Sequence, residues 1–220
     1  MIVLLVRHGQ TDWNEEGVFR GRIDVKLNAL GRRQAEIVGG VFSEIPLAAV
    51  YSSPLSRAME TAECIAGQQQ PAGITAQPCS ELIDIDFGEW EGMRSTEVRS
   101  AYPDTYRLWK RHPEKVRIPG AETLQDVRTR MVSGLHAVLS ENADRTVALV
   151  SHGLTNKVML CALLGLDNSH FWKIKQDNGA INIFKYTEEG TKLILMNETT
   201  HLRPISQIVK DVKNLENPLG

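Results

Sequence analysis

Short apolar runs alternate with longer amphipathic segments along most of this chain. Continuous apolar runs of this kind are typical of strands buried in a parallel sheet, and they predict strands over 2–6, 48–51 and 146–151. Apolar residues three and four positions apart are typical of helices with one buried face, and they predict helices over 30–45 and 123–142. The alternation predicts an α/β fold, a three-layer sandwich in which helices cover both faces of a mostly parallel sheet.

Local signals complete this outline. Ser53-Pro54 resembles an N-cap followed by proline at the first helical position, which predicts a helix that runs to about Ala66. Another helix follows the strand 146–151 and ends at Leu164. Two further apolar runs, 180–186 and 192–196, predict a β-hairpin that closes the sheet.

Length and composition indicate a single domain over 1–220. The irregular segment 93–118 is rich in charged and aromatic residues, and we interpret it as a lid or specificity insertion over the edge of the sheet. The segment 203–220 is a polar tail.

Charge and cysteine content exclude several classes of protein. The net charge of −2 does not provide the excess of positive charge that is typical of nucleic-acid-binding proteins, and no apolar run is long enough to span a membrane. The three cysteines form no C-x-x-C pair, which argues against a disulfide framework or a zinc site. A cytoplasmic location fits these features, and the sequence is compatible with a homodimer.

The candidate chemistry lies directly after two of the predicted strands. Arg7-His8-Gly9 follows the first strand, and His152-Gly153 follows the strand 146–151. Open α/β sheets bind their ligands at the carboxyl ends of parallel strands. Two histidines and an arginine at that edge predict a site for a phosphate group, and histidine can act as a nucleophile as well as a base.

Four strings occur together and in order: R-H-G-Q-T, S-S-P-L-x-R-A-x-x-T, F-G-x-W-E-G and V-S-H-G. Together they resemble the histidine phosphatase superfamily, which is also called the phosphoglycerate-mutase-like family, and the resemblance extends from residue 2 to about 202. It implies hydrolysis of the phosphomonoesters of small metabolites through a phosphohistidine intermediate, without a metal or another cofactor.

The resemblance also implies a role for each matching residue. His8 attacks phosphorus, and Asp84 occupies the position of the general acid. Asn14 and Arg20 bind substrate together with Gly153. The residues that clamp the phosphoryl oxygens are Arg7, Arg57 and His152.

The physics of phosphoryl transfer agrees with these roles. Charge develops on three equatorial oxygens, so catalysis depends mostly on positioning and electrostatic stabilisation. The arginines offer forked, permanently charged donors that match phosphate, and a cationic His152 would add a third positive group in place of a metal. His8 must instead be neutral, with a backbone carbonyl that fixes its tautomer.

The proton donor departs from the family pattern. Glutamate is more common at this position, and Asp84 is shorter by one methylene group, about 1.5 Å of reach. Burial or a neighbouring anion would raise the pKa of such a carboxyl and let it act as an acid. Glu81 is the nearest alternative, and Asp86 and Glu89 are further ones.

Within the superfamily the chain has its nearest resemblance to metal-independent phosphoserine phosphatases and to α-ribazole phosphatases. However, Phe87 stands where the phosphoserine subgroup has a substrate-contacting histidine, and a hydrophobic ring cannot bind a carboxylate. Two alternative activities within the superfamily are a 2,3-bisphosphoglycerate-dependent phosphoglycerate mutase and a bisphosphatase of a sugar-phosphate regulator. The segment from Gly92 to Gly120 is short for a mutase. The alternative from another class is a catalytically silent relative that binds phosphorylated ligands.

Overall fold

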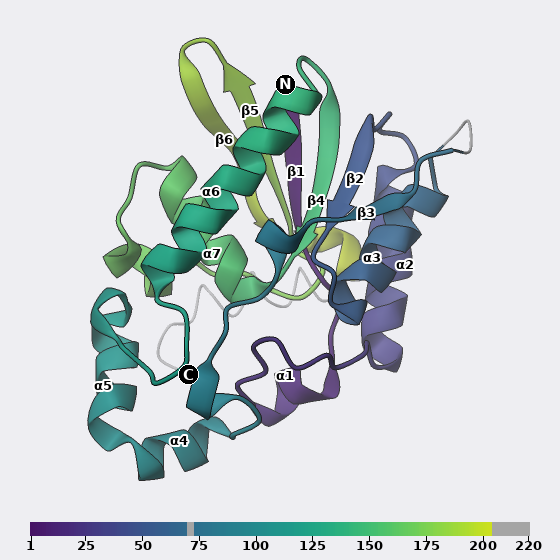
Figure 1. The fold of residues 1–220 in the computed structure, drawn as a ribbon. Coiled ribbons are helices and arrows are strands. Elements are labelled where there is room, and N and C mark those ends of the chain that lie inside the picture. Colours follow the sequence, from purple (N-terminus) through teal and green to yellow (C-terminus); the bar gives the residue numbers. More distant parts are fainter. Residues whose placement is uncertain (70–72, 204–220) are drawn as a thin grey trace, which may run out of the picture.

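The computed structural model describes residues 1–69 and 73–203. These residues form a six-stranded sheet with the strand order β3-β2-β4-β1-β5-β6 (Figure 1). The strands are β1 (Ile2–Arg7), β2 (Ala49–Ser52), β3 (Ala76–Pro78), β4 (Thr146–Ser151), β5 (Ile181–Thr187) and β6 (Gly190–Glu198).

The sheet is parallel at its centre and antiparallel at one edge. β4 pairs in parallel with both β1 and β2, and β3 pairs in parallel with β2. β5 runs antiparallel to β1, and β6 completes a hairpin with β5. The predicted strands and the hairpin are therefore confirmed, and so is the mostly parallel sheet.

Helices cover both faces of the sheet. Alternate residues of β1, such as Leu4 and Val6, belong to one apolar core, and Val3 and Leu5 belong to another on the opposite face. This two-sided burial explains why β1 and β4 have continuous apolar sequences. The helices α2 (Ala29–Phe42) and α3 (Ser56–Gly67) pack on the first face, and α6 (Leu124–Glu141) and α7 (Gly153–Leu163) pack on the second.

Shorter helices gather beyond the carboxyl ends of β1, β2 and β4, as Figure 1 shows. They are α1 (Asp12–Glu16), α4 (Ser95–Ala101) and α5 (Pro103–Arg111). Helices α4 and α5 belong to the segment 93–118 that we interpreted as an insertion over this edge. The 3-10 helices cover 80–82, 88–90, 113–115, 168–173 and 200–202. In the described part of the chain, no helix has the length and apolar character needed to span a membrane.

Some sequence predictions were wrong in detail. Ser53 does not cap α3, which begins at Ser56 with Leu55 at the N-cap. The Ser53 hydroxyl lies instead 2.7 Å from Nε2 of His152. The side chain that we predicted to cap the helix therefore contacts one of the two motif histidines. The short strand β3 has only three residues and gives no periodic signal. All but Arg203 of the polar tail 203–220 lies outside the described residues.

Two glycines allow the loop after β1 to pack directly against α2. A Cβ atom at Gly9 would overlap the carbonyl oxygen of Gly31, and a Cβ atom at Gly31 would overlap the carbonyl oxygen of Gln10. The amide of Gly9 also donates to the Thr61 hydroxyl on α3 at 3.2 Å. These contacts fix the backbone on the carboxyl side of His8.

Candidate active site

The strand register brings the two motif histidines together. Arg7 is the partner of Ser151 in the parallel pair of β1 and β4, so His8 and His152 each stand one residue beyond this last pair. The amide of His8 donates to the carbonyl of Ser151 at 3.0 Å. The ring centroids of His8 and His152 are 5.1 Å apart, and both side chains are fully buried.

His8 has the geometry of a neutral imidazole ring. Its Nδ1 atom lies 2.5 Å from the carbonyl oxygen of Gly9, which can only accept, so Nδ1 carries the proton. This agrees with the carbonyl predicted from the sequence. Burial lowers the pKa of His8 well below 6.5, and the positive charges of Arg57, Arg20 and Arg7 act in the same direction. Its Nε2 atom is left unprotonated, with a free lone pair.

His152 is also neutral in this arrangement, which differs from our expectation of a cation. Nε of Arg57 donates to its Nδ1 atom at 3.2 Å, so Nδ1 accepts and the proton lies on Nε2, facing the Ser53 hydroxyl. Burial and the neighbouring arginines lower the pKa of His152 well below 6.5. A bound phosphate would favour the charged form of this ring.

Arg57 is fully buried and all three of its nitrogens donate hydrogen bonds. Besides His152, it donates to the carbonyls of Ile23 and Gly21, each at 2.9 Å, and it pairs with the Asp84 carboxylate at 3.3 Å. This bonding fixes the guanidinium group of α3 beside the two histidines. It also joins the carboxylate and the histidines into one cluster.

Arg7 and Arg20 are less completely bonded. Arg7 donates to the carbonyl of Gln176 at 2.6 Å, and Arg20 donates to the hydroxyl of Thr11 at 2.9 Å. The Nε atoms of both arginines are buried without a hydrogen-bond partner, and so is Nε2 of His8. Burial lowers the pKa of Arg7 to about 10 and that of Arg20 to about 9, so both remain charged at neutral pH.

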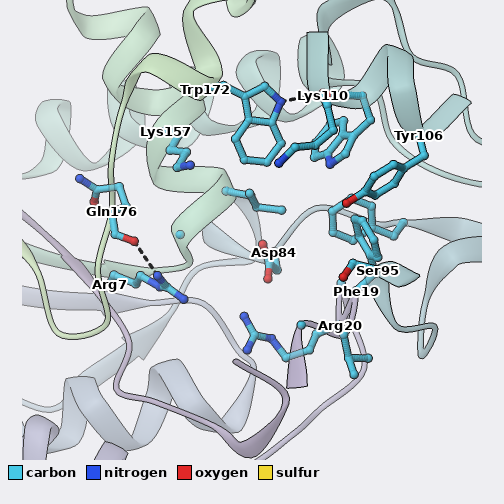
Figure 2. A pocket seen from close by; sticks show the side chains of 17 residues that line it. Arg7, Phe19, Arg20, Asp84, Ser95, Tyr106, Lys110, Lys157, Trp172 and Gln176 are labelled. Atoms are coloured by element: carbon cyan, nitrogen blue, oxygen red, sulfur yellow. Dashed lines mark hydrogen bonds between the residues drawn. The ribbon is translucent and has the colours of Figure 1, made fainter. Parts of the chain in front are cut away.

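Arg7 and Arg20 line a cavity of about 360 Å³, whereas His8, Arg57 and His152 are fully buried and are not among its lining residues. In Figure 2, Arg7 and Arg20 lie at the bottom of the view, Asp84 lies between them and the upper wall, and Lys110 and Lys157 flank Trp172 at the top. The volume suits a small metabolite. The segment 93–118 contributes Ser95, Tyr106, Trp109 and Lys110 to the lining, which is the position expected of a specificity insertion.

The other predicted substrate residues differ in their placement. Gly153 lines the cavity, and a Cβ atom there would lie 3.0 Å from the guanidinium carbon of Arg7, so glycine leaves room for that side chain. Asn14 does not line the cavity. The side-chain oxygen Oδ1 of Asn14 accepts from the backbone amide of Thr11 at 2.9 Å and from the side-chain amide of Asn178 at 3.3 Å. These hydrogen bonds stabilise the first turn of α1.

Asp84 is the one carboxylate among the described residues that line the cavity. Its Oδ1 accepts from the Thr155 hydroxyl at 3.1 Å, and its Oδ2 faces Arg57. The alternatives lie elsewhere. Glu81 accepts from Ser80 and faces a separate surface groove, Asp86 pairs with Arg22, and Glu89 accepts from Tyr102.

The sequence reasoning missed Arg130, which holds the segment that carries Asp84. From α6, Arg130 donates to the carbonyls of Glu81 and Ile83 at 2.7 Å and to that of Asp84 at 3.2 Å. Glu122 orients this guanidinium group through hydrogen bonds of 2.8 and 3.0 Å. No sequence motif marks this role, because it depends on how α6 packs against the segment 81–84.

Lys157 and Trp172 were missed as lining residues as well. Lys157 lies four residues after Gly153 on α7, so the two share one face of the helix. That spacing was a usable signal. Trp172 follows α7 in a 3-10 helix, and its position over the cavity depends on tertiary packing.

Comparison with known proteins agrees with this geometry. Residues 3–199 match the family described as the histidine phosphatase superfamily (branch 1). The chain belongs to this superfamily. Phosphoserine phosphatase 1 of Hydrogenobacter thermophilus is 36% identical over 200 residues, which are 91% of this chain and 93% of that protein.

Solved structures of other histidine phosphatases have the same fold. Phosphoserine phosphatase from Entamoeba histolytica, in complex with 3-phosphoglyceric acid, superimposes with a TM-score of 0.81 at 27% identity, covering 92% of this chain and 99% of that one. A putative alpha-ribazole-5'-P phosphatase from Escherichia coli has a TM-score of 0.80 at 24% identity, covering 90% and 96%. The resemblance inferred from the motifs is confirmed, and this histidine phosphatase acts on small phosphorylated metabolites.

The buried histidines of this phosphatase lead to a pH-dependent prediction. Because burial and three nearby arginines lower the pKa of His8 and that of His152 below 6.5, we expect both rings to be neutral at pH 6.5 in the free enzyme. In ¹⁵N NMR spectra, His8 should carry its proton on Nδ1 and His152 on Nε2. The urea-unfolded chain is the control, in which both rings titrate at about 6.5. A folded His8 that is half protonated at or above pH 6.5 contradicts this assignment.

Proposed function

We propose that this histidine phosphatase hydrolyses phosphomonoesters with His8 as the nucleophile and Asp84 as the general acid. The observation that carries the proposal is that three of the buried nitrogens without a partner in the described chain lie close together in this cluster: Nε2 of His8 and the Nε atoms of Arg7 and Arg20. Unpaired buried polar atoms are costly, so three of them in one place need an explanation. A phosphoryl group would supply oxygens to both arginines and phosphorus to His8.

In the first step, the lone pair on Nε2 of His8 forms a bond to phosphorus, and the bond from phosphorus to the ester oxygen breaks. The leaving alkoxide takes a proton from Asp84. The Thr155 hydroxyl donates a hydrogen bond of 3.1 Å to this carboxyl and holds it in place.

In the second step, water attacks the phosphohistidine. Asp84, now a carboxylate, accepts a proton from this water, and the bond from phosphorus to Nε2 of His8 breaks. Orthophosphate leaves and His8 returns to its neutral state. Both steps place one carboxyl group on the side of phosphorus opposite His8, where the oxygen either leaves or enters.

Charge stabilisation comes from residues of the chain. Arg7, Arg20 and Arg57 surround the two histidines, and their permanent charges balance the equatorial oxygens in the transition state. In residues 1–69 and 73–203, no group of three His, Cys, Asp or Glu side chains is arranged to hold a metal ion. We therefore propose a reaction that continues in the presence of a chelator.

We propose a cytoplasmic setting, supported by the three free cysteines of the described chain. The single domain over 1–220 and a homodimer remain predictions. Small phosphorylated substrates are the partners that the cavity fits, and nothing in the net charge of −2 favours nucleic acid.

Replacement of His8 tests the nucleophile. We expect His8→Ala to lower kcat/KM for 4-nitrophenyl phosphate by at least about 10³-fold, which is about 4 kcal/mol of barrier, because no bond to phosphorus can form. The matched control is His136→Ala, an exposed histidine of α6 far from the cavity, which should keep wild-type activity. All assays contain a chelator. An inactive wild-type enzyme would favour the silent relative, and an active His8→Ala would overturn the assignment.

Leaving groups that differ in basicity test the proton donor. Asp84→Asn should slow glycerol 2-phosphate by about 10²–10⁴-fold, because a poor leaving group needs a proton. It should slow 4-nitrophenyl phosphate much less, since that leaving group is stable as an anion. The control is Asp86→Asn, whose carboxylate pairs with Arg22 outside the cavity. Equal losses on both esters would show that Asp84 has a structural role.

A further inference from the structure

The upper wall of the cavity carries two lysines that the proposed reaction does not use. Lys110 comes from α5, and its ammonium nitrogen lies 4.4 Å from the ring centroid of Trp172. Lys157 comes from α7 and lies 4.7 Å from the centroid of the same tryptophan. Figure 2 shows both side chains directed into the cavity beside this ring. Trp172 is itself fixed, because its indole N–H donates to the carbonyl of Trp109 at 2.6 Å.

Neither ammonium group is paired with a carboxylate of the described chain. Within the described chain both ammonium groups contact aromatic rings, and Lys157 also lies 5.2 Å from the ring centroid of Phe171. Burial, with Arg7 and Lys110 adding to it, lowers the pKa of Lys157 to about 8, although Asp177 and Cys161 act in the opposite direction. Lys157 is partly buried, so its unpaired charge is unfavourable, and the like charge of the exposed Lys110 beside the same ring adds to this cost. An anion placed between them would reduce the cost.

The charges of the lining leave room for such an anion. The cations that line the cavity are Arg7, Arg20, Lys110 and Lys157, and Asp84 is the one carboxylate of the described lining. Arg57 already compensates that carboxylate from behind. A phosphomonoester dianion held by Arg7 and Arg20 neutralises the lower part of the cavity. The positive charge of Lys110 and Lys157 then remains uncompensated.

Aromatic residues form another part of the lining. Phe87, Tyr106 and Trp109 line the cavity together with Trp172. Phe87 and Trp109 are nearly fully buried, with ring centroids 5.8 Å apart, so their positions are fixed by packing. A ligand that spans the cavity from the arginines to the lysines therefore meets aromatic as well as cationic side chains.

We propose that Lys110, Lys157 and Trp172 form a second-anion site, so that the preferred substrates are small phosphomonoesters that carry a carboxylate or a second phosphate at the end opposite the reacting phosphate. This inference rests on the proposed function, because it places the reacting phosphate at Arg7 and Arg20. Phe87 carries no charge, and in this site the two lysines supply the charge that binds the second anion.

Matched aryl esters test the site. The carboxylate arm compares 4-carboxyphenyl phosphate with 4-carbamoylphenyl phosphate, which has nearly the same shape without the charge. The phosphate arm compares 1,4-phenylene bisphosphate with 4-hydroxyphenyl phosphate. We expect the wild-type kcat/KM to favour the second anion by about tenfold or more in at least one arm, the size of a charge-assisted contact. The arm that responds identifies the anion.

Substitution of each lysine tests whether Lys110 and Lys157 cause the preference for esters with a second anion. Lys157→Gln and Lys110→Gln should each lower the ratio of kcat/KM between the paired esters by about tenfold, mainly through KM. Lys173→Gln is the matched control, because it removes one positive charge beside Trp172 from an exposed lysine that does not line the cavity. Circular dichroism checks the fold of each variant. If Lys157→Gln does not fold, the exposed Lys110 still decides the outcome.

The outcomes separate this inference from the proposed function. If the wild-type enzyme hydrolyses the uncharged esters but shows no preference in either arm, the second-anion site is wrong and the proposed function stands. A preference that persists in both lysine variants also overturns the site. If the wild-type enzyme hydrolyses none of the four esters, the proposed function fails. Calorimetric binding of the same pairs to the wild type and the variants then decides whether the lysines bind the second anion.

Discussion

Positive charge gathers at the carboxyl ends of β1 and β4. The arrangement of the site depends on the groups that offset the free-energy cost of removing this charge from water. Arg57, Arg7 and Arg20 all lie close to His8 and His152; Arg57 is fully buried, and Arg7 and Arg20 are partly buried where they line the cavity. Removing a guanidinium group from water is costly unless it is hydrogen-bonded or paired. The structure reduces this cost with backbone carbonyls and one carboxylate, and it keeps both histidines neutral.

The three arginines meet this constraint in two ways. Arg57 has a full set of partners, including Asp84 and two carbonyls, so its position is fixed before any ligand binds. Arg7 and Arg20 each keep a buried nitrogen without a partner. Such preorganised donors gain their bonds only when an anion arrives, which is how an active site directs binding energy towards a charged transition state. The neutral His8 is a further consequence, because the same positive charges oppose protonation of its ring.

Much of the fold could be predicted because β1 and β4 are buried on both faces and their sequences show it. Their parallel register then places His8 beside His152, so the central pair of the site also follows from the sequence. Other features depend on contacts between distant elements. The contacts of Arg130 with the carbonyls of the segment 81–84, and the position of Trp172 over the cavity, have no local signal. Our prediction of the residue at which α3 begins was wrong, because Ser53, a residue type that often caps helices, contacts His152 instead.

The most direct test of this account is to trap the phosphoenzyme. Wild-type enzyme is mixed with excess 4-nitrophenyl phosphate, quenched in base during the first turnover, digested and analysed by mass spectrometry. The account predicts a base-stable, acid-labile phosphoryl group on Nε2 of His8, formed as fast as 4-nitrophenol is released. A phosphoryl group on another side chain, or a first turnover that releases phosphate and 4-nitrophenol together without any phosphoenzyme, would contradict it.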